Sequence, residues 1–508
     1  MKRLAAYTGE AKFDSAMHAY YSQWREKHPY PEDFKHCFET ASNTTIDSLF
    51  HQLSQQGSLE PVTEKKKLKF TTLFSLKDTK KYHYISFTPV AGYNFYDKFM
   101  PGIGIHNYQL PLSKVQFYAA VMYADGSKQI HGAARVAYNI YKKQNNYQFA
   151  ISYADFNMNK QPEYIDGTHY YAANESAYFT KVTKVVPSFH WTIFNKDARS
   201  TERWNIYLRT FLINEEQHNF NPIDSVTQGI SKTNQSYYVN QLKIAWSNYR
   251  KLYPYDLTLQ IDQGKEFVRA GLTGHYFFNY PNEKQKGINA RFFAGKFFYT
   301  VPKTYQSQYE TDRYHLNLTG ADGNEDYTYS DYFIARNKTD KWQSQQLMER
   351  DGFFKMRTDF LSSKVGKTDD WLIAFNLEGK VPNNINPLQI LPFKIPLHFF
   401  LDVGTYADVW KDNNGSTQRF LYDAGLYLPI MKGAIKIYIP IMYSNVFKDY
   451  VNSVLNGNYS NNNDMFDKIA INGKSLRTRL GNTFLQTVQF SFNLDLLKPQ
   501  RLSGQIPL

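Results

Sequence analysis

Histidine and carboxylate side chains are the groups with which this 508-residue sequence could hold a catalytic metal. A hydrolytic zinc site needs two His one helical turn apart, an adjacent Glu as general base and a third ligand downstream, which gives the pattern His-Glu-x-x-His. The sequence has 13 His but no such pattern, and His28 and His36 lie on different predicted helices. We therefore expect no catalytic residue, no metal ligand and no cofactor in this chain.

One short motif has part of the spacing of a calcium loop. Asp322, Asn324 and Asp326 occupy the first three ligand positions. Tyr327, however, stands where the loop needs Gly, and Phe333 stands where it needs a bidentate Glu. We therefore predict a polar loop here and no calcium site.

Basic residues on the polar faces of alternating segments are the remaining functional candidates. These candidate lumen-facing residues are Arg135, Arg203, Arg209, Lys243, Arg269 and Arg291. If the polar faces line a barrel, the lumen is basic and favours anions. Alternatively, the basic groups pair with interior acids such as Asp256 and Asp262 and close the barrel without conduction. We expect the plugged, structural barrel and keep the anion path as the alternative.

The segments that would position these residues alternate with a period of two. Trp204, Ile206 and Leu208 alternate with polar neighbours, and the stretches 130–140 and 487–496 repeat the pattern. Roughly 16 such segments of about 9–13 residues follow one another, the length that a tilted strand needs to cross a bilayer. The predicted fold class is mainly β, a large antiparallel transmembrane-type β-barrel preceded by a short α-helical segment.

Composition agrees with this fold. Aromatic residues make up 17% of the chain, with 41 Tyr and 38 Phe, yet the mean hydropathy is −0.56. A barrel with a lipid-facing band, aromatic girdles and a polar lumen needs this mixture. The formal charge of +13 is spread along the chain and does not cluster, so we expect no nucleic-acid partner. The single Cys37 excludes internal disulfides and is expected to be a small core residue.

Residues 1–57 are predicted to be helical. Phe13, Met17 and Trp24 recur at helical spacing and form one apolar stripe. Pro31 opens a second helix, because its fixed φ suits a first helical turn. A third short helix is expected before Gly57. Helices of this size need a partner surface, because they cannot build a substantial core alone.

The stretch from Leu4 to Phe50 resembles the C-terminal helices of the catalytic domain in aminopeptidase-N-like gluzincins, which are zinc metallopeptidases. The resemblance is carried by Tyr7-Thr8-Gly9-Glu10, Phe13, Tyr21, Trp24, Lys27-His28-Pro29 and Pro31-Glu32-Asp33-Phe34. It covers about a tenth of the 508 residues, and in that family these helices lie downstream of the zinc site. It implies a parent protein whose zinc-binding catalytic portion is absent from this chain, with Met1 an internal residue.

The alternating, Tyr-rich strands resemble outer-membrane barrels that are fused behind gluzincin-like peptidases in some Gram-negative bacteria. The expected organisation is a helical segment (1–57), a basic linker (58–82), a β-barrel (83–498) and a tail (499–508). This resemblance implies the outer membrane of a Gram-negative bacterium, with the lipid bilayer and the upstream peptidase portion as partners and zinc only in that portion. Many such barrels end on an aromatic residue, whereas Lys498-Pro499-Gln500 follows the last predicted strand here.

The predicted function is therefore a membrane anchor or translocator region of a gluzincin aminopeptidase-like protein. The alternative is a soluble large β-barrel or sandwich that acts as a binding protein without a peptidase link. Strand length argues against the alternative, because strands of soluble proteins average about 5–6 residues.

Overall fold

The computed structural model describes most of the chain, in two compact units. The described residues are 1–53, 66–73, 78–79, 81–110, 112–161, 170–172, 175–197, 199–223, 227–281, 286–302, 313–337, 342–357, 365–382, 386, 397–411, 418–450 and 487–493. The first unit comprises Met1–Leu68 with Asp78–His83, and the second comprises Lys69–Lys77 with Tyr84–Leu508. The boundaries expected from the sequence, near 57, 82 and 498, stay predictions.

The first unit contains four helices: α1 (Lys2–Thr8), α2 (Glu10–Trp24), α3 (Pro31–Ser42) and α4 (Asp47–Leu53). Gly9, with a φ of +84°, separates α1 from α2, a break that the apolar spacing does not predict. Pro31 is the first residue of α3, as expected, and the Asp33 carboxylate accepts the Tyr30 N–H at 2.7 Å. Among the described helices, none is long and apolar enough to cross a membrane.

The core of the helical unit is small. Leu4, Ala16, Phe38 and Ile46 are buried together, one from each helix or its flank. Cys37 is also buried, as expected for a small core residue.

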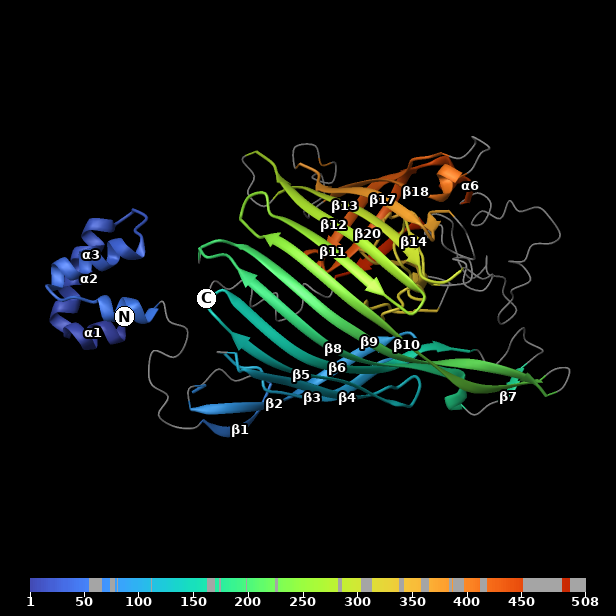
Figure 1. Cartoon of the computed structure of the whole chain (residues 1–508), viewed down its shortest axis with the longest axis horizontal. Helices are drawn as coiled ribbons and strands as arrows, with labels where there is room; N and C mark the ends of the chain where they lie inside the picture. Colours follow the sequence, from blue (N-terminus) through green and yellow to red (C-terminus); the bar gives the residue numbers. More distant parts are fainter. Residues whose placement is uncertain are drawn as a thin grey trace. The chain divides into compact units, whose positions relative to one another are not determined.

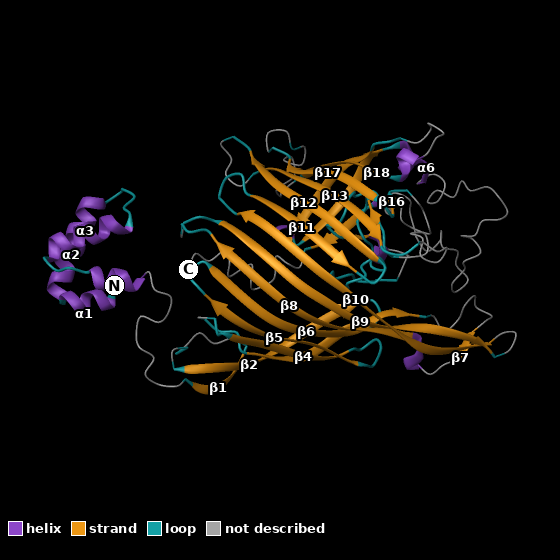
Figure 2. Cartoon of the chain, in the orientation of Figure 1, coloured by secondary structure: helices purple, strands orange, loops and turns teal. Residues whose placement is uncertain are grey.

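The second unit consists mainly of strands (Figures 1 and 2). The strands are β1 (Lys67–Thr72), β2 (Tyr82–Asn94), β3 (Lys98–His106), β4 (Val115–Tyr123), β5 (Ile130–Tyr141), β6 (Asn145–Lys160), β7 (Tyr170–Ala172), β8 (Phe179–Phe194), β9 (Glu202–Pro222), β10 (Thr227–Asn248), β11 (Tyr255–Gln263), β12 (Phe267–Asn279), β13 (Gly287–Tyr299), β14 (Leu316–Asn317), β15 (Gln346–Leu347), β16 (Lys367–Thr368), β17 (Trp371–Lys380), β18 (His398–Tyr406), β19 (Leu421–Ile430), β20 (Ile435–Tyr443) and β21 (Gln489–Phe492). Two short helices, α5 (Asp408–Lys411) and α6 (Asn445–Tyr450), lie among the later strands.

Nineteen of the described strands form one sheet. From β2 to β6, from β8 to β13 and from β17 to β21, strands that follow one another along the chain pair antiparallel; β6 pairs with β8 and β13 with β17 in the same way. The short strands β7 and β15 pair parallel with β10 and β21, and β14 and β16 form a separate pair. The prediction of a mainly β fold with one large antiparallel sheet is confirmed.

The two faces of the strands differ in chemistry, as the alternation predicts. On β9, Trp204 and Leu208 are 42% and 48% exposed, whereas Glu215, on the other face, is 1% exposed. Successive side chains of a strand point to opposite faces, so the apolar set of β9 lies outward and the polar set inward. The outward face of β9 is therefore apolar, whereas its inward face carries charged residues such as Glu215 beside the buried Phe211 and Ile213.

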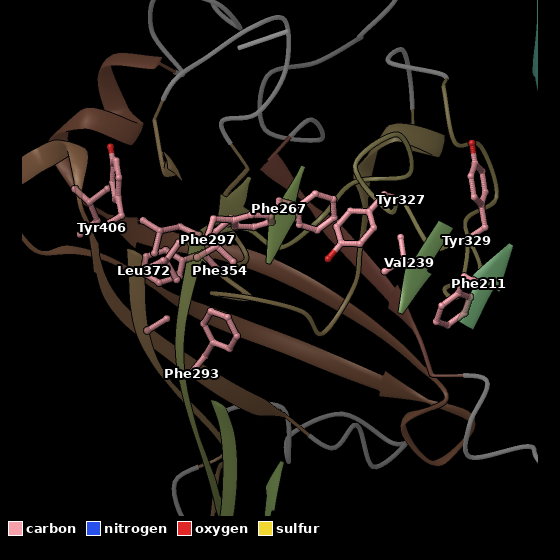
Figure 3. Close-up of a cluster of buried hydrophobic side chains, with 14 of the residues drawn as sticks. Phe211, Val239, Phe267, Phe293, Phe297, Tyr327, Tyr329, Phe354, Leu372 and Tyr406 are labelled. Carbon is pink, nitrogen blue, oxygen red and sulfur yellow. The ribbon is translucent and has the colours of Figure 1, made fainter. Parts of the chain in front are cut away.

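The stretch from Ala321 to Tyr332 corrects the prediction of a polar end loop. Asp326 is fully buried, and Tyr327 and Tyr329 are 2% and 7% exposed. Tyr327 and Tyr329 belong to the main apolar cluster of the unit, in which Phe267 lies 5.4 Å from the ring of Tyr327 (Figure 3). Acidic side chains make this stretch look solvent-exposed in the sequence, but arginines inside the sheet neutralise them.

Two further expectations concern charged or polar runs. The basic run at 65–69 was expected to be linker, but Lys67 and Lys69 lie in β1, which pairs with β2. A strand can carry Lys on a solvated edge, so the charge does not exclude pairing. The polar run Asn461-Asn462-Asn463-Asp464 lies outside the described residues.

Candidate functional site

The candidate site is the chain between β13 and β17, of which residues 313–337 and 342–357 are described; we call these residues the inserted segment. It contacts strands all around the sheet. Tyr332 donates its hydroxyl to the Tyr93 carbonyl of β2 at 2.7 Å, and its ring lies 6.2 Å from Phe492 of β21. Because β2, near the start of the sheet, and β21, its last described strand, contact the same residue, the two ends of the sheet lie on either side of the inserted segment.

Arg313 attaches the inserted segment to β9. Its two terminal nitrogens donate to the two oxygens of Glu215 at 2.8 and 2.6 Å. The Tyr237 hydroxyl of β10 donates to the same carboxylate at 2.6 Å. A two-pronged arginine–carboxylate pair fixes orientation as well as distance, so this contact holds the start of the segment to the wall.

Asp326 is the centre of the inserted segment. Arg350 contacts one carboxylate oxygen at 2.7 Å, and Arg336 contacts the other at 3.2 Å. The Asp331 backbone N–H donates to the latter oxygen at 3.0 Å. Burial alone would raise the pKa of Asp326, but the two guanidinium groups hold it at about 2. The carboxylate is therefore ionised and holds two distant parts of the segment together.

Glu325, beside it, is a second buried acid with basic partners. Its carboxylate contacts His315 at 2.8 Å and Lys367 at 2.8 Å. Burial opposes ionisation, yet His315 and Lys367 lower the pKa of Glu325 well below its usual value.

Strands β11 and β12 contact the inserted segment through Asp262 and Arg269. Arg269 of β12 contacts Asp262 of β11 at 3.3 Å and also pairs with Asp351 of the segment. The Tyr327 hydroxyl donates to Asp262 at 2.8 Å. This side chain set is nearly dry, since Arg269 is 4% exposed and Asp262 is fully buried.

Lys355 binds the opposite part of the wall. Its ammonium group lies 3.1 Å from Asp402 of β18 and 3.5 Å from Glu378 of β17. Its backbone N–H donates to Asp423 of β19 at 2.8 Å, and that of Met356 donates to the same oxygen at 2.5 Å. Lys355 is fully buried, so Asp402, Glu378 and the Phe353 carbonyl, which accepts from the ammonium group at 2.9 Å, replace the water that a lysine normally keeps.

The backbone of the segment also fits closely on itself. Gly352 donates to the Asn317 carbonyl at 3.1 Å, and Phe354 donates to the Leu318 carbonyl at 2.8 Å. A Cβ on Gly352 would lie 2.3 Å from the Leu318 oxygen. The flanking Asp351 and Phe353 have positive φ values of 48° and 53°, conformations that non-glycine residues seldom adopt.

The six basic residues predicted from the sequence fall into two sets. Arg269 and Arg291 contact the inserted segment, through Asp351 and through Glu349 at 3.9 Å respectively. Arg291 also donates to Asn376 of β17 at 2.8 Å. Arg135 donates to Gln148, Arg209 donates to Gln241, and Arg203 lies over the ring of Tyr249. Lys243 lies in register with Tyr207 and Gln260. That all six line a lumen stays a prediction.

The interior acids named from the sequence do pair with basic groups. Asp262 contacts Arg269, and Asp256 contacts His275 at 3.0 Å. The main cationic residues of the inserted segment itself were missed, namely Arg313, Arg336, Arg350 and Lys355. The available signal was the length of the interval 300–370, which far exceeds a hairpin connection and contains four Arg.

The contacts of the inserted segment fill the interior of the sheet and do not indicate a chemical reaction. Among the described residues, no group of three or more His, Cys, Asp or Glu is arranged to hold a metal ion. The partial calcium motif is used locally, because Asp322 accepts the backbone N–H groups of Asn324 and Glu325, both at 2.9 Å.

Comparison with known protein families and with curated proteins finds no match for this chain. Several solved structures resemble it distantly. BamA from Haemophilus ducreyi lacking POTRA domains 1-3 has a TM-score of 0.37 and 11% identity, covering 72% of this chain and 70% of that one. CdiB from Acinetobacter baumannii has a TM-score of 0.32 and 10% identity, covering 68% and 54%. CdiB from Escherichia coli has a TM-score of 0.34 and 8% identity, covering 74% and 64%. These TM-scores are low, so the function of this chain is inferred from its own contacts.

Proposed function

We propose that this chain is an outer-membrane β-barrel whose lumen is closed by its own inserted segment. It serves as the membrane anchor of a larger Gram-negative protein, with translocation requiring displacement of the segment. The observation that carries this proposal is that the sheet exposes apolar side chains on its outer face while charged side chains are buried on its inner face.

The outward face supports the membrane assignment. On β9 and β10, the outward residues from Trp204 and Trp246 to Leu212 and Tyr238 are mostly apolar, and the two Trp rings stack at 5.7 Å. The band spans residues 204–212 of β9, which matches the roughly 9–11 residues of a membrane-crossing strand. The paired indoles at one end resemble an interfacial aromatic girdle.

The contacts of the inserted segment favour a membrane anchor with a closed lumen rather than an open channel. Its ionic contacts reach β9, β12, β17 and β18, and most of the charged groups involved are nearly inaccessible to water. Breaking one partner of such a pair exposes an uncompensated buried charge and costs about 3–5 kcal/mol. Several pairs would have to break together before a solute could pass.

The helical unit supports a peptidase parent only through its sequence resemblance. Tyr7, Tyr21 and Leu53 are 53%, 63% and 66% exposed, leaving apolar surface that an upstream catalytic portion would cover. Expressing the chain with its upstream coding sequence should yield zinc-dependent aminopeptidase activity that a chelator abolishes. A longer product without that activity would separate the barrel from the peptidase link.

The membrane assignment is tested by gel mobility. The chain, refolded in detergent, should migrate differently before and after boiling, because a closed barrel resists the gel detergent until it is heated. It should also require detergent to stay in solution. A monomer that is soluble in plain buffer and shows no mobility shift would favour the soluble binding protein instead.

A further inference from the structure

Three arginines on the inner face of the sheet are not neutralised by acids. On β9, Arg203 and Arg209 share a face with Glu215, which binds the inserted segment, so both point inward. Arg135 of β5 reaches across to Gln148 of β6 at 2.5 Å. All three lie close enough to His190 of β8 to interact with it electrostatically.

These residues form one surface on neighbouring strands. Gln148 is in register with His190, and His190 is in register with Tyr207. The rings of His190 and Tyr207 stack at 4.0 Å with an interplanar angle of 11°. We call Arg135, Arg203, Arg209 and His190 the arginine patch.

The arginine patch differs from the other inward arginines in its partners. Arg269, Arg313, Arg336 and Arg350 each contact a carboxylate. Among the described residues, the hydrogen bonds and ring contacts of the patch arginines are with neutral groups: the amides of Gln148 and Gln241 and the rings of Tyr249, Tyr207 and Phe211.

The nearest acids do not complete the patch. Asp262 and Asp331 interact with Arg209 electrostatically. Asp262 already accepts from Gln241, Tyr327 and Arg269, and Asp331 pairs with Arg350 at 3.4 Å. Their charge is therefore balanced mainly within the inserted segment and its wall contacts.

Two features of the arginine patch favour binding of a hydrogen-bond acceptor: N–H groups without a partner, and small side chains beside the arginines. The Nε groups of Arg203 and Arg209 are buried without a hydrogen-bond partner. A buried donor without a partner costs about 1–3 kcal/mol. The residue in register with Arg209 on β8 is Ser188, which is in register with Ala150 on β6. These small side chains leave room on the wall beside the three arginines, which are half-buried.

We propose that the arginine patch binds a phosphate-class oxyanion. Guanidinium groups present planar forks of N–H donors that match the several acceptor oxygens of such an anion. The inward direction of the patch means that the anion belongs to a solute or polymer entering the lumen. A phosphate carried by a lipid headgroup has the same chemistry but would have to reach the inner face. The inference rests on the barrel of the proposed function and does not depend on the peptidase link.

The test is calorimetric titration of the full chain, folded in neutral detergent, with tripolyphosphate at constant ionic strength. The variant R135Q/R203Q/R209Q should bind at least tenfold more weakly than the wild type. The control K143Q/K251Q/K265Q removes the same charge from exposed turns and should bind as the wild type does. Equal weakening in both variants, or no binding by the wild type, would overturn the proposal, since only diffuse charge would then be at work.

A second arm separates the sources of the phosphate. Phosphatidic acid is added to the micelles in place of tripolyphosphate. Loss of binding in the arginine variant with both probes shows that the patch accepts phosphate from either source. Loss only with tripolyphosphate assigns it to solutes, and both results support the oxyanion site.

Folding is checked independently by the mobility shift on boiling, which also tests the barrel itself. The variant R135K/R203K/R209K keeps the charge but not the forks and should bind with intermediate affinity. If neither arginine variant folds, the wild type still decides the matter: tripolyphosphate should raise the temperature at which its mobility shift occurs, and an unchanged temperature would contradict the site.

Discussion

Asp326 is the residue on which the inserted segment depends most directly. Asp326→Asn leaves Arg336 and Arg350 without the carboxylate that they share. We expect the free energy of unfolding to fall by about 3–5 kcal/mol, as for other broken buried pairs. The measurement is the urea concentration at which the folded band disappears from an unboiled gel.

The matched control is Asp125→Asn. Asp125 pairs with Lys128 at 2.8 Å, but both side chains are more than half exposed. Exposed pairs contribute about 0–1 kcal/mol, so its urea midpoint should stay near that of the wild type. Equal midpoints for the two variants would mean that the buried charge is not what holds the segment.

The same carboxylates predict how stability depends on pH. The pKa of Asp326 is about 2 in the folded chain, against 3.8 ordinarily, and that of Glu325 is also lowered. A lowered pKa means that the unfolded chain binds more protons, so this stability is complete above about pH 4 and is lost as the pH falls toward 2. Burial and the neighbouring Asp326 raise the pKa of Asp331, which acts in the opposite direction.

Urea midpoints measured from pH 6 down to pH 2 check this expectation. Such a series should show a decline below about pH 4 that is shallower in Asp326→Asn, because that variant lacks one of the titrating groups. If the urea midpoints of the two proteins fall in parallel as the pH is lowered, other carboxylates cause the loss of stability in acid.

Strand β10 tests the height of the membrane band. Ile244 and Ser236 lie on the same outward face, Ile244 within the apolar band and Ser236 beyond it, where it donates to Asn214 at 2.9 Å. A Lys at the bilayer midplane of a barrel costs about 2–4 kcal/mol, and near the interface about 0–1.

Ile244→Lys should therefore destabilise the chain in lipid vesicles by about 2–4 kcal/mol, while Ser236→Lys should have little effect. The measurement is urea unfolding followed by tryptophan fluorescence. Similar losses at both positions would argue against a bilayer around this face.

The inserted segment has its own test at Gly352. Gly352→Ala would place a methyl group 2.3 Å from the Leu318 oxygen, so the pairing of 352–354 with 317–318 must open. We expect release of the segment while the wall stays folded, seen as new cleavage by trypsin between 313 and 357 with an unchanged mobility shift. Gly433→Ala is the control, because nothing lies within 4 Å of a Cβ there, although its φ of +89° adds a backbone strain that Gly352 does not have. Equal protease resistance in both variants would contradict a tight fit at Gly352.

Elements with a repeating pattern could be predicted from the sequence, and the inserted segment could not. The spacing of Trp204, Ile206 and Leu208 predicts β9. The two faces of a strand have different surroundings, so apolar and polar residues alternate with a period of two. Asp326 and Arg350 follow no period, since their positions are set by partners far along the chain. The arginines Arg269 and Arg291 were found because they lie on strands, whereas their partners Asp351 and Glu349 do not.

The whole molecule is predicted to conduct poorly until the inserted segment moves. In planar bilayers, the wild-type chain should show little steady current. Arg336→Ala combined with Arg350→Ala removes both partners of Asp326 and should increase conductance severalfold. Arg25→Ala is the control, because its contact with Glu26 is exposed and lies in the helical unit. An unchanged current in the double variant, with a normal mobility shift, would mean that the wall is closed without the segment.

The sheet that encloses the inserted segment also sets the order of folding. Residues 313–357 contact β2, which precedes them by more than two hundred residues, and β19 and β21, which are synthesised after them. Such distant pairings form slowly, because their loop-closure entropy must be lost before any contact is gained. Because strands made before and after it contact the segment, we expect the charged segment to be in place before β17 to β21 complete the wall. Folding of the sheet and burial of the inserted segment are therefore coupled. The last strands supply contacts to the segment that the first strands cannot supply alone.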